Sequence, residues 1–480
     1  MEIKRNRVLS SMVWRFAERT GAQGVQLIVS IILARLLTPS DYGTVALLTV
    51  FISIANVFVD CGFGNSLVQK LNADDIDFSS VFFFNIGVGI ILYIVLFLAS
   101  PFIADFYHDP NLTSVLRVMA LSLIIGGIKS VQQAHIQKRL EFKKFFFSTA
   151  IGTIISAVVG IVMAYRGFGV WALVAQNMTN SVIDTIVVWI ASKWWPKLVF
   201  SIKRMRSLFG YGGRLLVSGL LDTIYNNMYS LTIGKFYSAA DLGLYNKGKS
   251  YPMLLVENIN STIQSVLFPV MAATQENINA VKQITRRSIM TSTFVIFAMM
   301  AGMAGIAKSF TVILLTEKWL GSVIYLQLCC FIYALWPIHT TNLAAIRALG
   351  RSDIFLKLEI IKKIIGMSML IVTIPLGVKA MVIGSCVSSV LSSFINASPN
   401  KKLLNYSYFE QIKDILPSFI LSIVMMIVVL SIQFFGLNVW ITLILQIIVG
   451  FVVYFGLAKL FKLECLEYVI NTVKGLKKNN

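Results

Sequence analysis

The chain has 480 residues, of which 57% are hydrophobic and only 13% are charged. Soluble domains contain about 25% charged residues, so this chain has too few charges to form a water-facing surface. The mean hydropathy of +0.77 agrees. The composition excludes an ordinary soluble protein and predicts an all-α polytopic membrane protein. The net charge of +20 is typical of loop charges that orient such a protein, and no nucleic-acid partner is expected.

Apolar segments follow one another along the whole chain. A membrane-spanning helix needs about 20 mostly apolar residues, and about fourteen segments qualify. They are 11–37, 42–68, 79–104, 112–136, 145–165, 169–192, 207–234, 242–271, 288–315, 320–345, 355–375, 377–398, 414–435 and 437–461. The connecting loops are too short to hold a soluble domain, which excludes an attached ATPase or soluble catalytic domain.

Basic residues are distributed unequally between alternate loops. With the N-terminus inside, only five of the loop lysines and arginines fall on the outer side, namely Arg166, Lys235, Lys308, Lys318 and Lys379. Because Lys and Arg accumulate on the cytoplasmic side, we expect a multi-pass protein of the bacterial inner membrane with both termini in the cytoplasm.

Several charged residues lie inside the predicted helices. The basic ones are Arg15, Arg19, Arg35, Arg117, Lys129, Arg214, Lys247 and Lys249, and the acidic ones are Glu18, Asp60, Asp184, Asp222 and Glu257. A charge near the bilayer centre costs about 3 kcal/mol on insertion scales. We therefore expect those that cannot reach the interface to pair or to face a hydrated cavity, and the excess of basic residues favours an anionic cargo.

The basic residues most suited to bind such a cargo lie on three helices. Arg15 and Arg19 are four residues apart and share a helix face, which suits a phosphate site; an ion pair with Glu18 is the alternative. Lys247 and Lys249 could line a cavity together with Arg214. Candidates for ion coupling or for a polar cavity wall are Glu18, Asp60, Asp222 and Glu257, although helix packing would also explain a polar stripe.

Two segments 200 residues apart resemble each other. Residues 34–43 (ARLLTPSDYG) and 234–243 (GKFYSAADLG) both carry a basic residue, then Asp, then Gly at matching places. Six helices separate the copies, which predicts two six-helix lobes related by a pseudo-two-fold axis along the membrane normal. The predicted divisions are 1–206, 207–400 and a C-terminal part, 401–480, with two additional helices and a cytoplasmic tail.

Short motifs in helices 1 to 10 resemble those of a known family. They are LARLLTPSDYG at 33–43, DCGFGNSLVQK at 60–70, QKRLEF at 137–142, GLYNK at 243–247, VLFP at 266–269 and EKW at 317–319. In this order they resemble polysaccharide exporters of the colanic-acid and teichuronic-acid type. These exporters belong to the multidrug/oligosaccharidyl-lipid/polysaccharide superfamily.

The resemblance implies a flippase for undecaprenyl-pyrophosphate-linked oligosaccharide repeat units, used to make surface polysaccharide by alternating access between two lobes. It implies a lipid-linked substrate, a coupling H⁺ or Na⁺, and a polymerase and glycosyltransferases of the same pathway as partners. Alternatives are a peptidoglycan-precursor flippase, a drug/cation antiporter, or a membrane-embedded polymerase or glycosyltransferase. The short outer loops disfavour the last, so no enzyme activity is expected.

Two motifs mimic nucleotide or metal sites. Residues 243–250 (GLYNKGKS) satisfy the P-loop pattern, and 74–77 (DDID) contains the D-x-D pattern of metal-dependent glycosyltransferases. The first lies between spanning helices with no α/β domain around it. The second precedes a helix whose N-terminal dipole favours acids. The three histidines are scattered, so we expect neither a metal site nor a cofactor.

Overall fold

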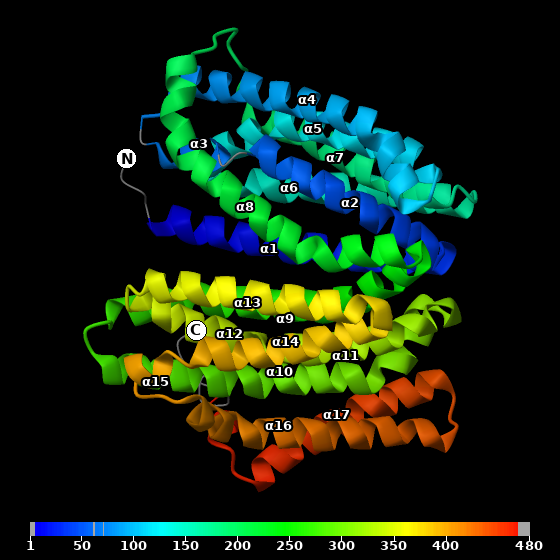
Figure 1. Ribbon diagram of the computed structural model, residues 1–480, viewed down its shortest axis with the longest axis vertical. Helices are drawn as coiled ribbons and strands as arrows, with labels where there is room; N and C mark the ends of the chain where they lie inside the picture. The colour runs from blue at the N-terminus through cyan, green and yellow to red at the C-terminus, as the bar shows by residue number, and fades with distance from the viewer. Residues whose placement is uncertain (1–4, 61–62, 71, 469–480) are drawn as a thin grey trace. The chain divides into compact units, whose positions relative to one another are not determined.

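The computed structural model describes residues 5–60, 63–70 and 72–468, without the side chains of 5–13, 15–20, 65, 207–212, 214, 215 and 262. These described residues form helices and no strands, which confirms the all-α prediction (Figure 1). The helices are α1 (Arg5–Leu36), α2 (Pro39–Asp60), α3 (Phe63–Gln69), α4 (Asp75–Tyr107), α5 (Asn111–Lys138), α6 (Phe142–Tyr165), α7 (Val170–Ser192), α8 (Ile202–Phe236), α9 (Ala239–Ala273), α10 (Ile278–Leu315), η1 (Glu317–Ser322), α11 (Val323–Ala334), α12 (Trp336–Ala348), α13 (Ser352–Thr373), η2 (Ile374–Leu376), α14 (Val378–Ala397), α15 (Asn400–Leu403), α16 (Tyr408–Ser431), η3 (Ile432–Phe435) and α17 (Val439–Leu460).

Each of the fourteen predicted segments falls on one helix or on two or three consecutive helices. Within the described residues, nine helical stretches are long and apolar enough to cross a membrane. Helices α7, α8, α9 and α13 are not among these nine stretches, and the part of α1 with described side chains throughout, Gly21–Leu36, is apolar but shorter than a span. The chain is therefore a multi-pass membrane protein, and the count of fourteen spans stays a prediction.

Two predicted segments are each divided between two α-helices in the structure. The segment 42–68 comprises α2, which ends at Asp60, and the short α3, which begins at Phe63. The segment 320–345 is divided at Leu335 between α11 and α12. Pro337 at the start of α12 has no backbone N–H to donate and cannot continue the hydrogen-bond ladder of α11. Hydropathy alone does not reveal such interruptions, because the apolar character continues through them.

The chain forms two compact units, unit 1 (Met1–Gly243) and unit 2 (Leu244–Asn480). The division falls within α9, so its first five residues belong to unit 1. The predicted three-part division at 206 and 400 follows the sequence repeat rather than compactness, and it stays a prediction.

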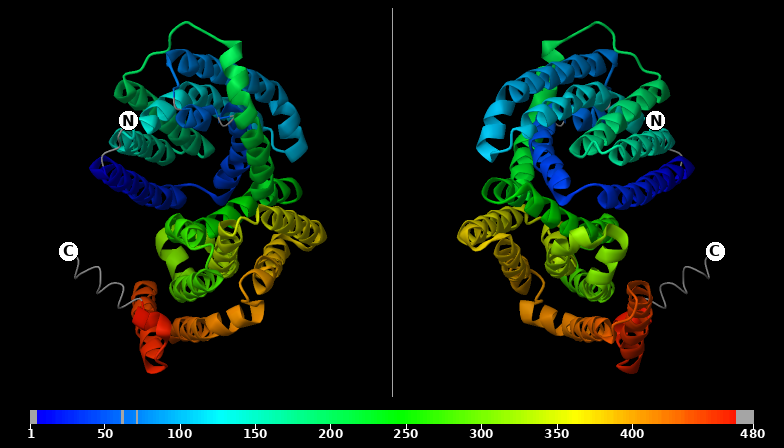
Figure 2. Two further views of the ribbon diagram at one scale, coloured as in Figure 1. Left: turned by 90° about the vertical axis from the view of Figure 1, so that its left-hand side faces the viewer. Right: turned by 90° about the vertical axis from the view of Figure 1, so that its right-hand side faces the viewer.

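Unit 1 is a bundle in which α6 packs along α7, α4 along α5, and α1 along α6 (Figures 1 and 2). At one end of the bundle, Phe63, Phe82 and Trp194 form part of an apolar cluster where α3, α4, α5 and the segment after α7 meet. The linker between α7 and α8 is tied to α4, because the backbone N–H of Lys197 donates to Ser79 Oγ at 2.9 Å.

Unit 2 is organised around α10, which packs against α11, α12, α16 and α17. The α16–α17 pair lies along α10, as Figures 1 and 2 show. The Tyr454 hydroxyl of α17 donates to the Phe294 carbonyl of α10 at 2.7 Å. A buried amide cluster joins α12, α15 and α16, since Asn342 exchanges hydrogen bonds with Gln411 and accepts one from Asn400.

The two copies of the sequence repeat adopt the same local structure. In the first copy, the Thr38 hydroxyl donates to Asp41 Oδ2 at 2.6 Å, and in the second Ser238 donates to Asp241 Oδ2 at 2.6 Å. In each copy the backbone N–H of the Asp donates back to the hydroxyl. This reciprocal pattern satisfies N–H groups at the start of the helix, and here it begins α2 and α9 alike.

Candidate functional site

The structure describes only some of the side chains that were predicted to bind or couple. The backbones of Arg15, Glu18 and Arg19 lie in α1 and that of Arg214 lies in α8, but these side chains lie outside the described part. Their proposed contacts with phosphate or with a coupling ion stay predictions.

Unit 1 contains a polar cavity of about 540 Å³. Its wall is formed by α1, α2, α5 and α7, and the predicted residue Asp60 lies in it at the end of α2. Lys129 also lines the cavity and forms an ion pair with Asp184 of α7, with 3.0 Å between Nζ and Oδ2. The Asp184 carboxylate accepts a second hydrogen bond from the Ser148 hydroxyl of α6. The charges of Lys129 and Asp184 are therefore compensated within the bundle, as membrane burial requires.

Amide side chains dominate the rest of the wall. They are Gln26, Asn56, Gln133, Asn177 and Asn180. Four hydroxyl side chains accompany them, Thr49, Ser122, Ser130 and Ser181. Because an amide exposed to hydrocarbon loses its hydrogen bonds at a cost of a few kcal/mol, the cavity must hold water or a polar ligand.

The charges within the predicted helices indicated Asp60, Lys129 and Asp184 but not these uncharged amides. A signal was present on α5, where Ser122, Gly126, Lys129, Ser130 and Gln133 line the cavity. Their spacing of three or four residues places them on one helix face. Recognising the contribution of α7 would have required its orientation, which local periodicity does not give.

Asp222 and Glu257 do not join this wall. Asp222 is exposed on α8 in unit 1, and Glu257 is exposed on α9 in unit 2. Of the acids named as coupling candidates whose side chains are described, only Asp60 lies in the unit 1 cavity.

Lys247 and Lys249 lie on α9 within unit 2. Lys247 is only 5% exposed, and its ammonium nitrogen is 5.7 Å from the ring centroids of both Tyr251 and Trp319. Lys249 Nζ is 5.9 Å from the Tyr245 ring. These distances are within the range of cation–π attraction. Because residues two apart do not share a helix face, the two lysines contact different surroundings.

The P-loop pattern lies wholly inside α9. Its glycines serve helix packing: a Cβ on Gly243 would be 1.9 Å from the Pro39 carbonyl oxygen, and one on Gly248 would be 2.8 Å from the Leu326 nitrogen. The interpretation that this motif is not a nucleotide site agrees with that geometry.

The acids of the D-x-D motif are paired with bases and cap a helix. Asp74 is the N-cap of α4 and forms a capping box with Asp77. Asp77 binds Lys70 at 2.7 Å, and Asp75 binds Lys197 at 2.7 Å. Over the described residues, no group of three His, Cys, Asp or Glu side chains could hold a metal ion.

Unit 2 has an apolar groove of about 510 Å³ between α9, α10, α16 and α17. Its lining includes Phe294, Ala298, Gly302, Met425, Val429, Gly450 and Phe451. A hydrocarbon chain fits such a wall, whereas a charged or sugar-bearing group does not.

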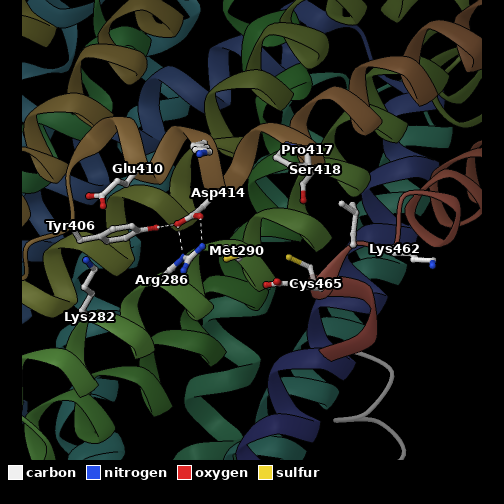
Figure 3. A pocket seen from close by; sticks show the side chains of 13 residues that line it. Lys282, Arg286, Met290, Tyr406, Glu410, Asp414, Pro417, Ser418, Lys462 and Cys465 are labelled. Carbon is white, nitrogen blue, oxygen red and sulfur yellow. Dashed lines mark hydrogen bonds and ion pairs between the residues drawn. The ribbon is translucent and has the colours of Figure 1, made fainter.

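A second pocket of unit 2, about 480 Å³, lies where α10, α16 and the residues after α17 meet (Figure 3). Arg286 forms two hydrogen bonds of 2.7 and 2.8 Å to Asp414, which also accepts one of 2.7 Å from the Tyr406 hydroxyl. Burial raises the pKa of Tyr406, and the bond to the Asp414 carboxylate adds to this. Figure 3 shows Lys462 pointing away from this network. We interpret the network of Arg286, Asp414 and Tyr406 as a structural contact that joins α10 and α16 near their N-terminal ends.

The described residues form a helical membrane protein with a polar cavity in unit 1. The structure is similar to that of the lipid II flippase MurJ in an inward closed conformation, with a TM-score of 0.77 at 13% identity, covering 94% of this chain and 98% of that one. It is also similar to an inward-facing multidrug resistance MATE family transporter, with a TM-score of 0.58 at 15% identity, over 82% and 99% of the two chains. The fold is that of the MOP superfamily, as expected.

Residues 32–324 match the family described as polysaccharide biosynthesis protein, and the chain belongs to this family. The teichuronic acid biosynthesis protein TuaB of Bacillus subtilis is 24% identical over 72% of each chain. The lipopolysaccharide biosynthesis protein WzxC of Escherichia coli is 22% identical over 86% of this chain and 82% of its own. These findings confirm the resemblance seen in the motifs and identify a transporter, not an enzyme.

Proposed function

We propose that this protein flips undecaprenyl-pyrophosphate-linked oligosaccharide repeat units across the bacterial cytoplasmic membrane for surface polysaccharide synthesis. The observation that carries the proposal is a polar cavity inside a membrane-spanning bundle of a polysaccharide biosynthesis family member. A glycan head group crosses hydrocarbon slowly because each unsatisfied polar group costs several kcal/mol there. A hydrated protein path removes that cost.

The lipid part of the substrate needs a different surface. The apolar groove of unit 2 suits a polyprenyl chain, which can remain in hydrocarbon while the head group moves. The pyrophosphate needs cations, and Arg15, Arg19, Arg214, Lys247 and Lys249 are proposed to supply them. Lys247, being buried among aromatic rings, would first have to move to reach a phosphate.

The energy source is proposed to be a proton or sodium gradient. The candidate coupling carboxylates are Glu18, Asp60, Asp222 and Glu257. Among them we favour Asp60, because it lies in the polar cavity. Transport that persists after both gradients are collapsed would contradict ion coupling.

The location is proposed to be the cytoplasmic membrane with both termini inside, and partners are proposed to be the polymerase and glycosyltransferases of the same pathway. The unequal distribution of loop lysines and arginines supports this orientation. Labelling of single cysteines placed at Arg166 and at Lys401 tests it: a membrane-impermeant reagent added to whole cells should reach only the first.

A second candidate function is flipping of a peptidoglycan lipid precursor, because the fold is so similar to that of a lipid II flippase. Deletion of the gene discriminates between the two. Loss of surface polysaccharide with complete repeat units retained in the inner leaflet supports the first function. Arrest of cell-wall synthesis supports the second.

Complementation of that deletion tests the proposed function and its basic residues. The wild-type chain and Lys249→Arg should restore export, whereas Lys249→Glu and Arg19→Glu should abolish it while the protein still accumulates in the membrane. Normal export in both charge-reversal variants would show that these basic residues are not needed for transport. Failure of the wild type to restore export would remove the flippase proposal itself.

A further inference from the structure

We propose that the polar cavity of unit 1 binds the sugar residues of the substrate, as a glycan subsite formed by α2, α5 and α7. This inference rests on the proposed flippase function and adds to it the part of the substrate that this cavity receives. It follows from the hydrogen-bonding capacity of the wall, its charge balance and its fixed geometry.

The wall offers donors and acceptors without a large net charge. Within the described residues, the side-chain amides of Asn56, Gln133 and Asn177 have no hydrogen-bond partner. Each amide supplies two N–H donors and one carbonyl acceptor. A sugar hydroxyl both donates and accepts, so a polyhydroxyl ligand can satisfy both kinds of group at once.

The charges of the cavity disfavour other ligands. Among the described residues of the wall, Lys129 is already paired with Asp184 at 3.0 Å, and Asp60 adds a negative charge, so the described part of the wall offers a pyrophosphate no unpaired cation. The cavity measures about 540 Å³, which is far more space than a single cation held by oxygen ligands at about 2–2.6 Å would fill. That volume is within the roughly 300–1,000 Å³ of small-molecule sites.

Close helix contacts fix the walls in place. A Cβ on Gly127 of α5 would be 2.7 Å from the Asn85 carbonyl oxygen of α4, and one on Gly160 of α6 would be 2.9 Å from Gln176 Cβ of α7. Gly127 and Gln176 are each adjacent in sequence to a cavity-lining residue, Gly126 and Asn177. The cavity-lining faces of α5 and α7 are therefore fixed in place by the packing of α5 against α4 and of α7 against α6. A binding site needs such preorganisation.

The test compares two ligands that differ only in the glycan. Full-length protein in lipid nanodiscs is titrated with undecaprenyl pyrophosphate and with the undecaprenyl-pyrophosphate-linked repeat unit extracted from the deletion strain. Wild-type protein should bind the glycan-bearing lipid more tightly. The Gln133→Ala/Asn177→Ala variant should lose about tenfold in affinity for the glycan-bearing lipid, as expected for two lost hydrogen bonds. Its affinity for undecaprenyl pyrophosphate should be unchanged.

Controls separate this inference from folding and from the proposed function. Gln275→Ala changes an exposed amide outside the cavity and should leave both affinities unchanged. Asn177→Ser replaces the amide by a hydroxyl, which still forms hydrogen bonds, and should lose less affinity. It replaces the double variant if that does not fold. Equal loss of both ligands, or no loss of either, overturns the glycan subsite while leaving flipping intact. A change in sodium or proton dependence with unchanged glycan affinity assigns the cavity to a coupling ion instead. Wild-type protein that neither binds nor flips the repeat unit overturns the proposed function itself.

Discussion

The Lys129–Asp184 pair shows how single charges are tolerated inside the bundle. Lys129 and Asp184 side chains are 25% and 13% exposed, and the pair connects α5 with α7 beside the polar cavity. Such a pair contributes little net stability compared with apolar residues, but removal of one partner leaves a poorly solvated charge.

We expect Lys129→Ala to reduce the stability of the protein by about 3 kcal/mol, because Asp184 then keeps only the Ser148 hydroxyl as a described partner. Asp184→Asn in the Lys129→Ala background should recover part of that loss, since it removes the uncompensated charge. Thermal unfolding in detergent, analysed as a double-mutant cycle, measures both effects. Additive losses would show that the two residues do not interact energetically.

Asp74 lies just outside the membrane-spanning part of α4. The hydrogen bond from the Asp77 backbone N–H, together with the nearby Arg204 guanidinium, lowers the pKa of the Asp74 carboxyl. A lowered folded-state pKa means that the charge contributes stability above the ordinary pKa of about 3.9, and that this contribution is lost as the pH falls through the folded-state pKa.

Asp74→Asn keeps an N-cap acceptor but removes the charge. We expect the variant to unfold at a lower temperature than wild type at pH 7, with a difference that begins to shrink below about pH 4. Melting curves of both proteins over this pH range test it. A difference that is constant with pH would show that the charge has no part in capping.

At the scale of helices, the crossing of α2 with the start of α9 depends on two glycines of the repeat. A Cβ on Gly43 would be 1.6 Å from the Ala239 carbonyl oxygen, and one on Gly243 would be 1.9 Å from that of Pro39. Position 239 corresponds to 39 in the repeat, so each copy places its glycine against the equivalent residue of the other. Small residues allow such close approach of helix backbones.

Gly43→Ala should therefore destabilise unit 1 by roughly 3 kcal/mol or displace the start of α9, because backbone atoms cannot yield as a side chain can. Gly87→Ala is the matched control, since no atom lies within 4 Å of a Cβ there. The control should be neutral or stabilising by up to about 1 kcal/mol through helix propensity. The unfolding temperature of each variant and the amount of each in the membrane test this prediction. Equal values for Gly43→Ala and Gly87→Ala would contradict the close contact between α2 and α9.

At the scale of the whole molecule, the polar and apolar surfaces belong to different units. Unit 1 contains the amide-lined cavity, and unit 2 contains the apolar groove. A lipid-linked oligosaccharide has the same two kinds of surface, a polar head group and a long hydrocarbon tail. The two units therefore present surfaces for both parts of the proposed substrate.

A larger side chain in the groove should impair transport of long-tailed substrates selectively. Gly302→Leu projects into the groove, where only the Met425 methyl lies within 4 Å of a Cβ. We expect slower flipping of undecaprenyl-linked repeat units, with less effect on analogues that carry a short prenyl chain. Gly456→Leu, on an open face of α17, is the control. Equal rates for both chain lengths in the Gly302→Leu variant would exclude the groove as a tail site.

The sequence alone determined the class, the positions of the helices and the family. Hydropathy, loop charge and short motifs are local properties, so they need no knowledge of distant contacts. They predicted the helices that follow each copy of the repeat, and they argue against a nucleotide or metal site at the P-loop and D-x-D patterns, which stays a prediction. Hydropathy placed α11 and α12 in one predicted segment, 320–345, because the apolar character continues across Leu335 and Pro337.

Only the tertiary structure decided which polar residues meet. Asn56, Gln133 and Asn177 are far apart in sequence and share one cavity because α2, α5 and α7 are rotated to face it. Lys247 and Lys249, by contrast, are two residues apart and lie on different sides of α9. Helix rotation is set by contacts such as those of Gly127 and Gly160, which depend on pairs of distant residues and therefore leave no periodic signal in one sequence.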